Sequence, residues 1–189
     1  MNLLRHARWM AAEGHVVRLL CAADSPLHRA AMAHIQSAES AGQSFDCRTV
    51  RRGFRYLAFA TAIHRASRLV RYRADWLWVR DPRDLDASSW ARRICRLMGG
   101  STRLLFQQGM QIPKSKKTPY HRFRYRAIDA WISPLSWLKD QVNRHTAVPE
   151  NRTHITPSDW MIAGSLPSTT PSSTGASADW IWASLRRAS

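Results

Sequence analysis

The sequence has no apolar run that could cross a membrane and no motif of several large enzyme classes. No stretch approaches the roughly 20 apolar residues that a membrane-spanning helix needs. Arg5, Arg8, Glu13 and Arg18 interrupt the first residues, so we expect no signal peptide. A phosphate loop, a GxGxxG fingerprint and a Gly-x-Ser-x-Gly elbow are also absent. We therefore expect a cytoplasmic protein without nicotinamide-dependent or serine-hydrolase chemistry.

Metal-binding patterns are missing as well. The three cysteines, Cys21, Cys47 and Cys95, have no metal-ligand spacing and cannot all pair with one another. This usage is typical of buried thiols in a reducing compartment. The eight histidines include no pair on one helical face with a nearby Glu. We expect no metal and no cofactor.

Acidic residues are scarce. The chain has 13 Asp and Glu against 29 Lys and Arg, and its formal net charge is +16. Such an excess predicts attraction to nucleic acid, anionic lipid headgroups or phosphorylated substrates. The alternative is an ordinary solvated basic surface. The arginines are scattered rather than gathered in one block, which weakens the nucleic-acid interpretation.

Strand and helix patterns alternate along most of the 189 residues, a length that suits one domain with a real core. Short apolar runs predict strands at 15–21, 45–50, 76–79, 104–106 and 130–132. Helical spacing predicts helices at 2–13, 26–41, 56–72, 85–98, 120–127 and 135–144. This alternation predicts the α/β class, with a Rossmann-like parallel sheet and helices on both faces.

The composition changes after Thr156. Ser, Thr, Pro, Gly and Ala dominate 164–178, which predicts disorder. Near the end of the chain, Trp180, Ile181 and Trp182 form an isolated apolar patch. We therefore expect a first domain at 1–157 and a low-complexity tail at 158–189.

Polar and charged residues follow three of the predicted strands, where ligands bind in parallel sheets. The candidate cleft-binding residues are Arg80, Asp81, Arg83, Gln107, Gln108, Lys114, Ser133 and Ser136. Catalytic residues are not assigned. Arg80, Asp81 and Arg83 are candidates for contact with hydroxyls or a phosphate.

Each candidate also has an ordinary structural interpretation. The alternative for the loop after 76–79 is local ion pairing, with Asp84 capping the next helix. Gln107 and Gln108 are candidates for hydrogen bonds to ligand hydroxyls, or satisfy only the backbone of their own loop. Ser133 and Ser136 either direct a helix N-terminus towards an anion or simply cap it.

Lysines and tryptophans complete the candidate cleft. Lys114, Lys116 and Lys117 are expected either to meet phosphate or anionic lipid, or to be solvated. Most of the nine tryptophans are expected in the core. Trp131 and Trp137 flank the predicted cleft and are the candidates for an aromatic surface that contacts a ligand.

Four segments carry a resemblance to a known family. They are NLLRHARWMAAEGHVVRLLC at 2–21, ADWLWVRDPRDL at 74–85, IDAWISPLSWLKDQV at 128–142 and RTHITP at 152–157. In order and spacing they resemble the amino-terminal domain of a family-four glycosyltransferase, a retaining enzyme with two facing Rossmann-like domains.

The resemblance implies a hexosyltransferase of polysaccharide biosynthesis. Its partners would be a nucleotide sugar and a saccharide or lipid-linked acceptor, with peripheral contact to the inner face of an anionic membrane and no nucleic acid. In the family, a pair of glutamates on the carboxy-terminal domain holds most of the donor. Gln107 and Gln108 stand where many relatives carry a cleft histidine.

The chain departs from the family at both ends. Relatives have a strand and a glycine-rich turn before the helix that opens this chain, so a first strand is expected to be missing. After Pro157 the family pattern stops. A shift of the reading frame offers an explanation, because Trp and Met have one codon each and Asp codons end in a pyrimidine. If each codon starts on the third base of the previous one, Asp159, Trp160, Met161 and the start of Ile162 become Leu-Asp-Asp, which fits the family. We therefore expect the tail at 158–189 to be disordered or out of frame, and the chain alone to have little transferase activity.

Two alternatives stay open at this point. The first is a basic binding module for nucleic acid or anionic membrane, which the net charge of +16 and the aromatic content favour. The second is a degraded reading frame that does not fold stably, because loss of a strand exposes a sheet edge.

Overall fold

The computed structural model describes residues 3–50, 58–155 and 180–187 of the chain. The helices are α1 (Leu3–Ala12), α2 (Pro26–Ser40), α3 (Ala58–Arg71), α4 (Leu85–Leu97), α5 (Pro119–Arg126) and α6 (Ser136–His145). The strands are β1 (His15–Ala22), β2 (Phe45–Val50), β3 (Trp76–Val79), β4 (Arg103–Gln107), β5 (Ala130–Ser133), β6 (Thr153–Ile155) and β7 (Trp180–Arg187). A short 3₁₀ turn at Glu150–Arg152 precedes β6.

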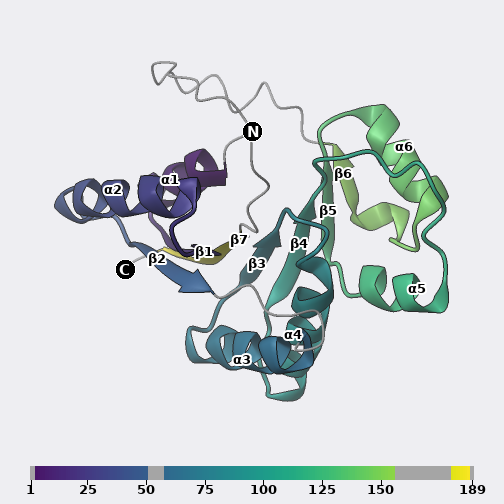
Figure 1. Ribbon diagram of the computed structural model, residues 1–189, viewed down its shortest axis with the longest axis horizontal. Helices are drawn as coiled ribbons and strands as arrows, with labels where there is room; N and C mark the ends of the chain where they lie inside the picture. Colours follow the sequence, from purple (N-terminus) through teal and green to yellow (C-terminus); the bar gives the residue numbers. More distant parts are fainter. Residues whose placement is uncertain (1–2, 51–57, 156–179, 188–189) are drawn as a thin grey trace.

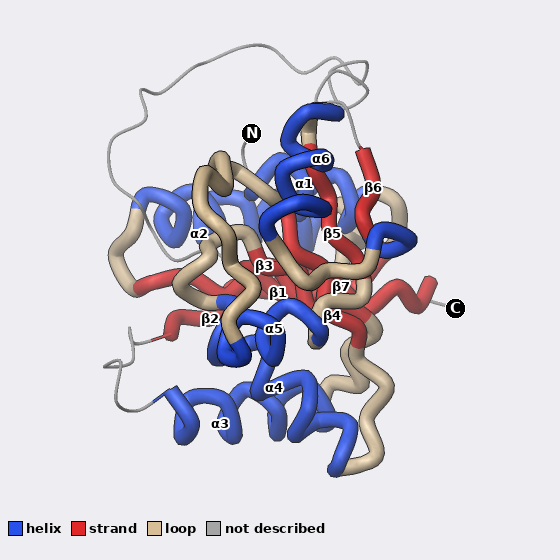
Figure 2. Tube along the Cα trace, turned by 90° about the vertical axis from the view of Figure 1, so that its right-hand side faces the viewer, coloured by secondary structure: helices blue, strands red, loops and turns tan. Residues whose placement is uncertain are grey.

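The described strands form one seven-stranded sheet in the order β2-β1-β7-β3-β4-β5-β6. The pairs β1–β2, β3–β4, β4–β5 and β5–β6 are parallel. Helices α1 and α2 cover one face of the sheet, and α3, α4 and α5 cover the other (Figures 1 and 2). The predicted α/β class with parallel strands is confirmed, and the arrangement is compatible with a Rossmann-like fold.

Local sequence signals explain where several helices begin and end. The Ser25 hydroxyl accepts a hydrogen bond from the His28 backbone N–H at 3.0 Å, and Pro26 occupies the first turn of α2. Gly42 and Gly99, which follow α2 and α4, have φ of +67° and +82°. Glycine adopts this left-handed conformation at little cost, so it ends a helix readily.

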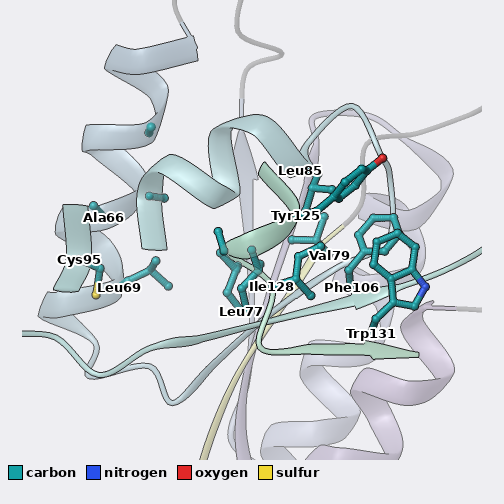
Figure 3. Packing of buried hydrophobic residues seen from close by; sticks show 14 of the residues in the cluster. Ala66, Leu69, Leu77, Val79, Leu85, Cys95, Phe106, Tyr125, Ile128 and Trp131 are labelled. Atoms are coloured by element: carbon teal, nitrogen blue, oxygen red, sulfur yellow. The ribbon is translucent and has the colours of Figure 1, made fainter. Parts of the chain in front are cut away.

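Two apolar cores lie on opposite faces of the sheet. One joins β3, β4 and β5 to α3, α4 and α5, with Leu69, Leu77 and Trp131 among its fully buried residues (Figure 3). The other packs α1 and α2 on β1, and includes Ala7 and Leu19. Each fully buried large apolar side chain contributes roughly 1.5–3 kcal/mol, so these cores supply the main driving force for the fold.

Strand β7 differs from the sequence-based expectation. It is antiparallel to both β1 and β3 and lies between them. This is the point where the strand order reverses, a position that the first strand of the chain takes in a doubly wound sheet. Residues 180–187 of the tail form β7, and the expectation that the tail is disordered or out of frame stays a prediction. The rest of the tail, 158–179 and 188–189, lies outside the described residues.

Candidate functional site

The polar residues at the ends of β4 and β5 are brought together at the carboxyl edge of the sheet. Gln107, Gln108 and Ser133 are all buried there. Gln107 is opposite Ile132 in the β4–β5 ladder, and the Gln108 backbone N–H donates to the Ile132 carbonyl at 2.8 Å. Sequence reasoning placed these three residues at one edge, and the structure confirms that placement.

The Gln108 amide group is held by several hydrogen bonds. Its carbonyl oxygen accepts from the Ser133 hydroxyl at 2.8 Å and from the Trp131 indole N–H at 3.2 Å. Its NH₂ group donates to the Met110 carbonyl at 2.9 Å. These bonds tie the end of β4 to the end of β5, so the role that the geometry supports for Gln108 is to position its loop and not to bind a ligand directly.

The first turn of α6 provides the exposed part of this edge. Leu135, Ser136 and Trp137 are all exposed there, and Trp137 is 43% exposed. Trp131, by contrast, is 1% exposed and packs against Phe106 and Tyr125. Of the two tryptophans predicted to flank a cleft, only Trp137 presents its ring to solvent.

The predicted capping roles of three residues are wrong. The N-cap residue of α6 is Leu135, and no side chain caps that helix, so neither Ser133 nor Ser136 does so. Ser133 is directed to Gln108 instead. Asp84 occupies the N-cap position of α4 but makes no side-chain capping bond, because its carboxylate faces Arg65 at 3.5 Å.

The loop after β3 is organised by its own charges. The Asp81 carboxylate accepts a hydrogen bond from the Arg83 backbone N–H at 2.8 Å, and Arg83 is exposed. Arg80 is half-buried in the same loop. This loop is separated from β5 by β4, so it borders the buried polar cluster without being part of it. Asp84 forms an ion pair with Arg65, 19 residues away, a contact that sequence spacing did not indicate, and the predicted local ion pairing within 80–84 stays a prediction.

Burial changes the acid–base properties of that bridge. Desolvation lowers the pKa of Arg65 to about 10, although the Asp84 carboxylate opposes the shift. A guanidinium with this pKa is still charged at neutral pH, so it anchors α3 to the loop at 81–84 as a cation.

The loop at 110–118 lies along α6. The Ile112 N–H donates to the Gln141 side-chain oxygen at 3.1 Å, and the Lys116 N–H donates to the His145 carbonyl at 2.6 Å. Lys114 and Lys117 are exposed on this loop. The structure therefore places Lys114 on an exposed loop that is bound to α6.

Cations crowd together on the side of α4 and α5. Burial lowers the pKa of Arg93, and the neighbouring Arg92 and Arg96 lower it further. Burial also lowers the pKa of His121, and the nearby charges of Arg124 and Lys116 lower it further. Helical spacing in 85–98 is the signal that could have revealed this arrangement, because residues three and four apart share a face.

The described residues hold no group of three or more His, Cys, Asp or Glu arranged for a metal ion. None of the described helices has the length and apolar character that a bilayer crossing requires. Searches against protein families, curated proteins and solved structures gave no match for this chain.

Proposed function

We propose that this domain is the acceptor-binding half of a retaining glycosyltransferase, which transfers a hexose from a nucleotide sugar to a saccharide or lipid-linked acceptor. The observation that carries the proposal is the exposed Trp137 ring beside the buried Gln108–Ser133 network at the carboxyl edge of a parallel sheet. Ligands of open α/β sheets bind at this edge. The four sequence segments that resemble the family supply the reaction class.

A sugar ring has an apolar face and a rim of hydroxyl groups, and this edge offers partners for both. The Trp137 indole provides a rigid apolar surface for the face of the ring. The exposed Ser136 hydroxyl and the free N–H groups in the first turn of α6 supply hydrogen-bonding groups beside it. The bonds from Gln108 to Ser133 and Trp131 hold the end of β5, and this preorganises the turn that carries Trp137.

This edge suits binding better than proton transfer. The exposed indole and hydroxyl side chains here can contact a sugar but do not exchange protons near pH 7. In the proposed enzyme class, catalysis rests on positioning and on stabilisation of the leaving phosphate. We therefore expect the purified 189-residue chain to bind an acceptor saccharide and to turn over nucleotide sugar very slowly or not at all.

The test is calorimetric or NMR titration of the purified protein with a panel of hexoses and short oligosaccharides. Trp137→Ala should weaken saccharide binding by about fivefold to thirtyfold, which corresponds to roughly 1–2 kcal/mol. Trp9→Ala is the matched control, because Trp9 is 50% exposed on α1 and should leave binding unchanged. Absence of binding to every saccharide, or equal losses in both variants, would contradict the proposal. Rapid nucleotide-sugar turnover by the chain alone would contradict the acceptor-half assignment.

A second function, binding to an anionic surface, is favoured by the net charge of +16 and by the exposed Lys114 and Lys117. Such binding would be electrostatic, so it should weaken steeply as salt is raised. Co-sedimentation with vesicles of neutral lipid, with and without phosphatidylglycerol, measures it. The double variant Lys114→Gln and Lys117→Gln should reduce sedimentation with anionic vesicles only. Equal sedimentation with neutral vesicles would exclude this function.

A further inference from the structure

Two of the three cysteines meet across the first two strands of the chain. The sulfur atoms of Cys21 in β1 and Cys47 in β2 are 3.4 Å apart, although the residues are 26 positions apart in sequence. Strands β1 and β2 are parallel neighbours, with Leu19 opposite Cys47 and Cys21 opposite Thr49. Residues two apart on a strand share a face, so both thiols lie on the face that α1 and α2 cover.

The two thiols differ in their exposure. Cys21 is fully buried, whereas Cys47 is only partly buried. The hydrogen bond from the Cys21 thiol lowers the pKa of Cys47, and this effect outweighs burial and the charge of Asp46, both of which raise it. Because Cys47 is the more exposed of the two thiols and its pKa is lowered, we expect it to react first, with the Cys21 sulfur 3.4 Å away.

The strand register makes a bond between these sulfurs possible but strained. An offset of two residues along neighbouring strands separates the Cα atoms by about 8 Å. Disulfides usually join Cα atoms about 4.4–6.8 Å apart, so the backbone must move for the bond to form. Strand β2 lies at the end of the sheet and pairs with β1. An edge strand is held by one ladder, so its movement costs less than that of a central strand, and the strained bond is readily reduced.

We propose that Cys47 and Cys21 form an oxidation site, in which a hydroperoxide oxidises Cys47 and Cys21 then closes a reversible disulfide between β2 and β1. In the first step the Cys47 thiolate attacks the peroxide, the O–O bond breaks, and a sulfenic acid and hydroxide form. In the second step the Cys21 thiolate attacks the sulfenic sulfur, the S–O bond breaks, and hydroxide leaves. The net reaction turns two thiols and hydrogen peroxide into one disulfide and two waters.

Cys95 is the internal control. It is fully buried in α4, and its sulfur lies 3.4 Å from the Thr102 hydroxyl. It belongs to the core on the other face of the sheet, whereas the Cys21–Cys47 pair belongs to the face of α1 and α2. It has no thiol beside it, so it should neither oxidise early nor join an internal disulfide.

The experiment uses the folded, fully reduced 189-residue protein and hydrogen peroxide as the oxidant. After treatment, free thiols are alkylated under denaturing conditions and the protein is digested with trypsin without reduction. Cleavage after Arg18, Arg29 and Arg48 separates the two cysteines, so the disulfide appears as a linked pair of peptides, 19–29 with 30–48. The intact protein should lose about 2 Da, and a thiol reductant should restore the original mass.

Two single variants separate the roles of the thiols. Cys95→Ser should still form the linked pair at the same rate. Cys21→Ser should stop at the sulfenic acid of Cys47, which dimedone traps, and should overoxidise on longer exposure. A linked pair that contains Cys95, linkage only between different molecules, or three free thiols after peroxide treatment would each overturn the proposal. The linked peptides from the unsubstituted protein decide the question even where a variant folds poorly.

Discussion

Replacement of Asp129 by asparagine tests whether a single carboxylate joins α4, β4 and β5. Asp129 lies in the turn that leads into β5 and accepts hydrogen bonds from Arg92 Nε at 2.6 Å and Arg92 Nη2 at 2.5 Å. It also accepts from the Leu104 backbone N–H at 2.8 Å, and Arg96 lies 3.7 Å away. One side chain therefore accepts three hydrogen bonds and forms one further ion pair, with partners on α4 and β4.

The expected cost follows from the burial of this ion pair. The Arg92 side chain is only 6% exposed, so water does not replace a lost partner there. An asparagine removes the charge and turns one acceptor into an NH₂ donor that faces other donors. Removal of one partner from a buried ion pair costs about 3–5 kcal/mol. For a domain of this size, such a cost lowers Tm by about 6–20 °C.

The assay is urea and thermal unfolding of Asp129→Asn beside Asp46→Asn. Asp46 pairs with Arg48 at 3.0 Å, but the two side chains are 38% and 62% exposed, so its replacement should cost less than about 1 kcal/mol. A further variant, Asp129→Asn with Arg92→Met, should recover part of the loss because it removes the unpaired buried cation. A loss at Asp129 no larger than the loss at Asp46 would refute this reasoning.

Two further predictions concern packing and pH. A Cβ added at Gly100 would lie 2.4 Å from the Cys95 sulfur, so Gly100→Ala should lower the free energy of unfolding by about 1–3 kcal/mol. Gly109 has open space around it, so the control Gly109→Ala should change that free energy by less than about 1 kcal/mol. Urea titration measures both. Burial and two nearby cations lower the pKa of His121, so the unfolded chain takes up a proton there before the folded protein does. Stability should therefore be complete above about pH 6.5 and fall as the pH drops below it. His121→Gln should show a smaller decrease in Tm between pH 7.5 and pH 5.5, and an unchanged decrease would count against the assignment.

The positions of most helices and strands could be predicted because their signals are local. Ser25 with Pro26 starts α2 where the sequence predicts, and Gly42 follows the end of the same helix. The apolar runs at 76–79 and 130–132 became β3 and β5 with nearly the same bounds. A strand of four or five apolar residues has few other ways to bury both faces, so these runs also predicted a parallel sheet.

The candidate site could be predicted only in part. The location of Gln107, Gln108 and Ser133 at one edge followed from the parallel sheet alone. Their orientation did not, because the direction of the Gln108 amide depends on Trp131 and Ser133, which are 23 and 25 residues away. For the same reason the sequence could not distinguish the buried Trp131 from the exposed Trp137.

The sequence by itself determined the local and repetitive features of this protein: its helix starts, its apolar strands, its basic character and its α/β class. The tertiary structure alone decided which distant groups meet, as in Asp129 with Arg92, Asp84 with Arg65, and Cys21 with Cys47. It also placed β7 between β1 and β3, where its ladders join both halves of the sheet. The physical reason is range, since capping and periodicity act within a few residues, whereas ion pairs, thiol contacts and strand pairing depend on the whole chain being folded.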